Sequence, residues 1–103
     1  MINSSFEVPG NHPCLEGHFP GRPIVPGVVA LDLMSEGLLR ELGDAYICGF
    51  SQIKFHAPIF PEQKVITQFV RKKDSLYDFT CEVDGIRVIS GKIRLASNGC
   101  KNG

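Results

Sequence analysis

Apolar side chains recur three and four positions apart along one segment of the chain, GVVALDLMSEGLLRELG. This spacing predicts a helix from Gly27 to Leu42. Gly43 follows directly and is typical of a residue that ends a helix. The apolar positions cover most of the helix circumference, so we expect the helix to be largely buried.

Period-two alternation replaces the helical spacing on both sides of this segment. A short strand is predicted over residues 2–8, where the Pro9-Gly10 turn signal ends it. Segments rich in β-branched and aromatic residues predict four further strands, over residues 45–57, 65–72, 75–83 and 86–96. Hairpin turns are expected at Lys73-Asp74 and Asp84-Gly85, and a bulge at Gly91.

The order of these elements predicts an α+β domain, in which an antiparallel sheet of about five strands wraps around one long central helix. Such a sheet leaves an open edge, and pairing with another subunit would cover it. We therefore expect a homodimer or a higher homo-oligomer. The domain is expected to span residues 1–97, and residues 98–103 to form a disordered tail.

Charge and composition limit the classes of function. The 103 residues carry 11 basic and 11 acidic side chains, which argues against a protein that chiefly binds nucleic acid or a membrane surface. The first residues lack the basic start and apolar stretch of a signal peptide, and no run is long enough to span a bilayer. A cytoplasmic location is expected, with the four scattered cysteines as free, mostly buried thiols.

The loop GHFPGRPIVPGV, which holds His18, leads into the predicted helix. Its three glycines and three prolines give the backbone a particular shape, so the loop either positions His18 for chemistry or is only an awkward connection. His12, Cys14 and His18 have metal-like spacing, but no convincing fourth ligand follows, and no metal is expected. His56 is expected at the surface or in a supporting role.

Two motifs point to a known family. The stretch GHFPGRPIVPGVVALDLM, residues 17–34, strongly resembles the signature of bacterial 3-hydroxyacyl-[acyl-carrier-protein] dehydratases, and IKFHAPIFPEQ, residues 53–63, resembles their K-F-x-x-P-V-x-P-G-D segment. The resemblance fits the chain to about Ala96 and implies the hot-dog fold. The helix acid is Asp32, as in the branch that includes double-bond isomerases, whereas the other branch has Glu. Glu36 stands where the family usually has Gln.

Dehydration of a 3-hydroxyacyl thioester needs a base, an acid and a group that stabilises the enolate-like thioester oxygen. His18 suits the base, because a neutral imidazole is basic near pH 7. Asp32 suits the acid if burial on the apolar helix raises its pKa. The free N–H groups around Gly27 and Val28 suit the thioester oxygen, because they point out of the helix start.

By resemblance, Gly27 supplies the oxyanion donor, and His18 works with the acid of a partner subunit, so the site would lie at a dimer interface. Glu36, one turn from Asp32, either hydrogen-bonds that acid or faces solvent. No metal or organic cofactor is implied, because the thioester itself acidifies the proton. Candidates for the lining of the acyl tunnel are Phe19, Val28, Leu31 and Phe55.

The resemblance thus predicts a lyase that converts 3-hydroxyacyl-[acyl-carrier-protein] thioesters to trans-2-enoyl thioesters, in fatty acid or polyketide-like biosynthesis such as that of aryl polyenes. The substrate would arrive on the phosphopantetheine of acyl carrier protein. Two alternatives stay open. One is a hot-dog acyl thioesterase, against which His18 in its loop counts. The other is a subunit active only in a heterodimer, because longer members carry another helix and strand before the first motif.

Docking of the acidic carrier protein would need a basic surface. Two clusters of basic residues in the strand-rich half could form one, or they could simply be solvated strand ends. They are Arg71, Lys72 and Lys73, and Arg87, Lys92 and Arg94.

Overall fold

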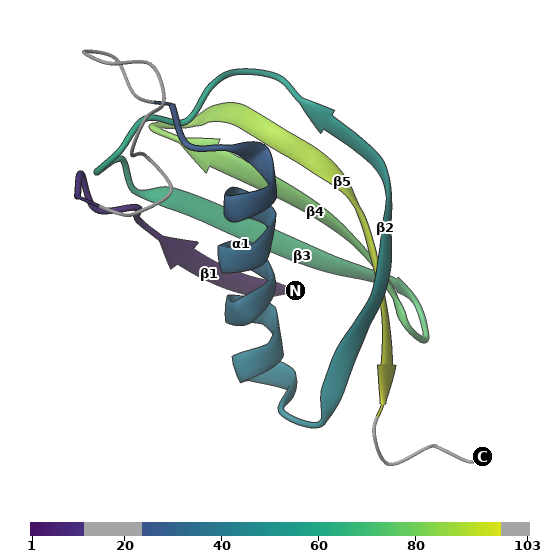
Figure 1. Ribbon diagram of the computed structural model, residues 1–103. Helices are drawn as coiled ribbons and strands as arrows, with labels where there is room; N and C mark the ends of the chain where they lie inside the picture. Colours follow the sequence, from purple (N-terminus) through teal and green to yellow (C-terminus); the bar gives the residue numbers. More distant parts are fainter. Residues whose placement is uncertain (12–23, 98–103) are drawn as a thin grey trace.

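The computed structural model describes residues 1–11 and 24–97, which form one helix and five strands (Figure 1). The elements are β1 (Ile2–Phe6), α1 (Gly27–Leu42), β2 (Ala45–Phe55), β3 (Val65–Lys73), β4 (Leu76–Val83) and β5 (Ile86–Ser97). They agree with the predicted elements to within two residues at each end. Residues 98–103, expected to form a tail, lie outside the described residues.

The five strands form one antiparallel sheet in the order β1-β3-β4-β5-β2. The sheet curves around one side of α1, with β1 and β2 as its two edges (Figure 1). The core lies between the concave face of the sheet and the helix. Its largest fully buried side chains are Phe69, Met34, Leu38, Ile89 and Ile93. The predicted architecture is confirmed.

Local sequence signals set both ends of α1. Pro26 is extended, with φ −60° and ψ 142°, and its carbonyl accepts the N–H groups of Val29 and Ala30. Gly43 has φ +73°, and its N–H donates to the Leu39 carbonyl at 2.7 Å. A positive φ favours glycine, so the prediction that Gly43 ends the helix is confirmed.

The expectation that α1 is largely buried is confirmed for the side that faces the sheet and is wrong for one face of the helix. Val28 is 75% exposed, and Asp32 and Glu36 are exposed as well. The remaining apolar helix positions are half-buried and pack against the core; they are Val29, Leu31, Leu33, Leu39 and Leu42. The buried positions are Ala30, Met34, Ser35, Gly37 and Leu38.

One predicted hairpin turn is confirmed and the other is shifted. Asp84 and Gly85 join β4 to β5 with φ values of +53° and +80°, as a type I′ turn requires. The β3–β4 turn lies at residues 74 and 75, one residue later than expected.

The bulge expected at Gly91 is found in the pairing of β5 with β2: two residues of β2, Gln52 and Ile53, stand opposite Gly91, between the pairs Ser51–Lys92 and Lys54–Ser90. On the other side Gly91 pairs in regular register with Phe79 of β4. A Cβ at this position would lie 2.6 Å from Cδ1 of Ile53. Glycine is therefore needed here for the close packing of β2 across β5. β2 has a second irregularity between Ile47 and Gly49.

Within residues 1–11 and 24–97 there is no helix with the length and apolarity that crossing a bilayer requires.

Candidate functional site

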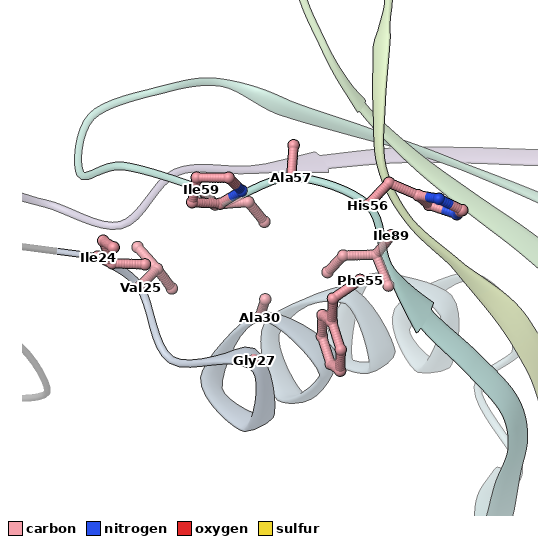
Figure 2. Close-up of a pocket in the computed structure, with 10 residues that line it drawn as sticks. Ile24, Val25, Gly27, Ala30, Phe55, His56, Ala57, Ile59 and Ile89 are labelled. Atoms are coloured by element: carbon pink, nitrogen blue, oxygen red, sulfur yellow. The ribbon is translucent and has the colours of Figure 1, made fainter.

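An apolar cavity of about 400 Å³ opens beside the start of α1 (Figure 2). Its walls come from the segment before the helix, the first helical turn and the connection between β2 and β3. The N–H of Val25 donates to the carbonyl of Ile59 at 2.8 Å and joins two of these walls. The volume is within the range of small-molecule pockets. The main apolar lining residues are Ile24, Val25, Ala30, Ile59 and Ile89.

The ring of Phe55 lies against the first turn of the helix, at the edge of this cavity (Figure 2). A Cβ at position 27 would be 2.7 Å from both Cε1 and Cζ of Phe55. The lack of a side chain at Gly27 leaves room for the Phe55 ring, which lies against the backbone there.

A second hollow, of about 390 Å³, lies between α1 and β2 and contains Asp32. Two of the predicted tunnel residues, Val28 and Leu31, line it. The remaining lining residues are Ser35, Ile47 and Phe50, which no sequence motif marked. Asp32 itself is exposed, so the described residues do not bury this side chain as expected.

The two hollows lie on different faces of the helix start. Gly27 and Ala30 line the first, and Val28 and Asp32 line the second. Residues four apart share a helix face, so Val28 and Asp32 stand one turn apart along the same side. Glu36 is exposed and lines neither of these two hollows.

The predicted base, His18, and Phe19 lie outside the described residues, as do His12 and Cys14. His56 is exposed, as expected. Its ring points away from the cavity (Figure 2), and its Nε2 lies 2.8 Å from Ser90 Oγ.

Residues 1–92 match the model of the ApeI-like family, described as ApeI dehydratase. The chain belongs to the ApeI-like dehydratases. Among curated relatives, 3-hydroxyacyl-[acyl-carrier-protein] dehydratase FabZ of Haemophilus influenzae is 32% identical over 94 residues. The match covers 81% of this chain and 61% of that protein. This ApeI-like chain thus spans less than two thirds of the length of the FabZ proteins it matches.

Solved structures identify the hot-dog fold. A chain of the dehydratase heterocomplex ApeI:P from Xenorhabdus doucetiae superposes with a TM-score of 0.75 at 23% identity, over 91% of this chain and 85% of that chain. A variant of the fluoroacetyl-CoA-specific thioesterase FlK superposes with a TM-score of 0.72 at 13% identity, over 93% and 87%. Because both share the fold, the fold alone does not distinguish a dehydratase from a thioesterase.

The basic clusters of this ApeI-like chain are partly neutralised by acids. Lys92 and Lys72 both contact the carboxyl group of Asp78, at 2.7 and 3.7 Å. The hydrogen bond from Lys92 lowers the pKa of Asp78, and the charge of Lys72 adds to the effect. Arg71 lies 3.7 Å from Asp74. These contacts favour solvated strand ends over a continuous basic face.

Of the two cysteines in the described part of the ApeI-like chain, one is buried and one is exposed. Burial raises the pKa of the Cys81 thiol to about 11, and its Sγ lies 3.4 Å from the hydroxyl of Thr67. Cys48 is exposed on β2. Within residues 1–11 and 24–97 there is no group of three His, Cys, Asp or Glu side chains that could hold a metal ion.

Proposed function

We propose that this chain is a dehydratase that converts 3-hydroxyacyl thioesters of acyl carrier protein to trans-2-enoyl thioesters. One observation carries the proposal: the carboxyl group of Asp32 stands in an apolar hollow, one turn from the start of the helix that holds it. Membership of the ApeI-like dehydratases supports it. The similarity to 3-hydroxyacyl-[acyl-carrier-protein] dehydratase FabZ supports it as well.

In the proposed reaction His18 removes the C2 proton and Asp32 protonates the departing C3 hydroxyl. The first N–H groups of a helix lack partners within the helix, and the helix dipole favours negative charge there. Those of Gly27 and Val28 would hold the thioester oxygen as negative charge develops on it. Phe19 belongs to the proposed lining of the substrate site.

The acid role of Asp32 requires a second subunit. A carboxyl group must be protonated at neutral pH to donate, and removal from water is what favours the protonated form. We propose that another hot-dog subunit covers the exposed face of α1 and pairs with the edge of β2. Apolar side chains exposed on these two elements, Val28, Tyr46 and Phe50, support this location.

The second subunit would be either another copy of this chain or a longer dehydratase. The ApeI:P dehydratase from X. doucetiae is a heterocomplex, which supports the heterodimer as the alternative. The proposal includes a cytoplasmic reaction with no metal or organic cofactor, in which the phosphopantetheine of acyl carrier protein carries the substrate.

The test is a dehydration assay on the purified protein with 3-hydroxyacyl-[acyl-carrier-protein] thioesters of several chain lengths, with the enoyl product followed by mass. Loss of general acid or base catalysis typically lowers the rate by about 10²–10⁴-fold, and we expect this of both His18→Ala and Asp32→Asn. Glu41→Gln is the matched control, because it removes an exposed carboxylate from the last turn of the same helix.

Activity of Asp32→Asn within threefold of the wild type would contradict the assigned acid. Release of free thiol without an enoyl product would show the thioesterase alternative instead. A wild type that is inert at every chain length would refute the homomeric enzyme, and mixing with a longer dehydratase subunit would then test the heterodimer.

A further inference from the structure

Two hollows flank the start of α1. On one side the cavity lined by Gly27 and Ala30 opens, and on the other the hollow lined by Val28 and Asp32. A thioester carbonyl could reach the first N–H groups of the helix from either side. Only an approach from the Val28 side brings the reacting carbons to the face of the helix that carries the acid.

On the first side the ring of Phe55 lies between the cavity and the backbone of Gly27. Its Cε1 and Cζ atoms fill the space that a side chain at position 27 would need. Phe55 is nevertheless 57% exposed, so this position gives it little of the stabilisation that a buried aromatic ring supplies. Its packing contributes little to the core, and the distinctive feature of its position is the contact with the helix start.

We propose that Phe55 is a positioning residue for the dehydratase reaction. Its ring closes the Gly27 side, so that the thioester carbonyl reaches the helix start from the Val28 side, one turn from Asp32. This inference rests on the proposed function. It also gives a different reason for glycine at position 27: a side chain there would displace the ring, whether or not it touched the substrate.

The two reasons for Gly27 predict different behaviour of a double variant. If glycine is needed because of the ring, removal of the ring makes alanine at position 27 harmless. Gly27→Ala/Phe55→Ala then matches Phe55→Ala in activity. If glycine is needed because the substrate approaches there, the two defects multiply and the double variant is worse than either single variant.

The experiment measures kcat and KM of the wild type, Phe55→Ala, Phe55→Leu, Gly27→Ala and the double variant, with the same carrier-protein thioester. Misplacement of a reacting group by about 1 Å can cost about 10²-fold. We expect Phe55→Ala to lower kcat by about 10–100-fold with a smaller change in KM, and Phe55→Leu to recover part of the loss. Ile66→Ala is the matched control, because Ile66 is 48% exposed on β3 and is absent from the lining of both hollows.

Thermal unfolding and the mass in solution accompany the kinetics. Both should be unchanged in Phe55→Ala, because the ring is half exposed. Phe55→Ala with kcat within twofold of an active wild type overturns the inference and leaves the proposed function intact. The inference is also overturned if the activity losses of the two single variants multiply in the double variant, or if the Phe55→Ala protein dissociates into single subunits. A wild type that forms no enoyl product instead overturns the proposed function, and the positioning role with it.

Discussion

Gly37 lies where α1 passes β1, and we expect Gly37→Ala to destabilise the protein although alanine is the better helix former. Gly37 is buried, and a Cβ there would overlap Ser4 Oγ and lie 3.0 Å from Ser4 Cβ. The hydroxyl of Ser4 can rotate away. Its Cβ cannot, because the backbone of β1 is held in register by β3. The added methyl group must therefore push the strand and the helix apart.

Two effects of opposite sign decide the magnitude. Alanine in a helix interior is more favourable than glycine by about 1 kcal/mol. Overpacking of a tightly packed position costs about 1–3 kcal/mol. Contact with a Cβ that cannot rotate puts the cost in the upper half of that range, so we expect a net loss of about 1–2 kcal/mol in the free energy of unfolding. In a domain of this size each kcal/mol lowers Tm by about 4–8 °C.

Urea and thermal unfolding of a double-mutant cycle test this explanation. Ser4→Gly removes both contacting atoms, so the Gly37→Ala/Ser4→Gly pair should recover about 1 kcal/mol or more relative to the sum of the single changes. Ser5→Gly is the matched control, because Ser5 adjoins Ser4 on β1 and is exposed. It should be additive with Gly37→Ala to within about 0.5 kcal/mol. A Gly37→Ala protein as stable as the wild type, or equal coupling to Ser5, would refute the steric explanation.

Three further predictions concern other parts of the fold. Burial raises the pKa of Cys81 to about 11, so a thiol reagent at pH 8 should label Cys48 and leave Cys81 unlabelled until the protein unfolds. Peptide mass mapping measures the labelling, and equal labelling of the two cysteines would contradict the prediction. The contacts with Lys92 and Lys72 that lower the pKa of Asp78 stabilise the fold at pH values above the pKa that Asp78 has in the unfolded state. This stability is lost as the pH falls through the pKa of Asp78 in the folded state. Asp78→Asn should therefore reduce stability by about 0.2–1 kcal/mol at pH 6, since the carboxyl group is 38% exposed, and the difference measured in urea titrations should shrink as the pH falls below the usual value of 3.8. Gly85→Ala should lower Tm by about 4–8 °C, because φ is +80° there; an unchanged Tm would show that the turn rearranges.

The sequence patterns predicted the helix and strands well, because each element begins and ends for reasons that lie in its own residues. Gly43 ends α1 through its own φ, and Asp84 and Gly85 form their turn through theirs. Alternation along each strand reflects the two faces of one sheet. None of these signals reports which side of the helix the sheet covers, and so the exposure of Val28 and Asp32 was not foreseen.

The candidate site was predictable only in part, for the same reason. The motif identified Asp32 and the start of the helix. These lie close together in space because they are close in the sequence of one helix. Ile47 and Phe50 join Asp32 only because β2 folds back along the helix, and their spacing is that of any strand. The glycine at position 91 marked the place of a bulge, but it did not show that the extra residue belongs to β2 or that the side chain of Ile53 fills the space beside it.

Both ends of β2 contact α1. At its beginning a tight turn after Gly43 joins it to the end of the helix, and at its end Phe55 rests on Gly27 at the helix start. The strand at the open edge of the sheet is thus mechanically coupled to the proposed centre of chemistry. A change in how the edge pairs with a neighbour would be transmitted to the helix start. Subunit recognition and turnover would then evolve together, and a swap of partners would alter the rate as well as the affinity.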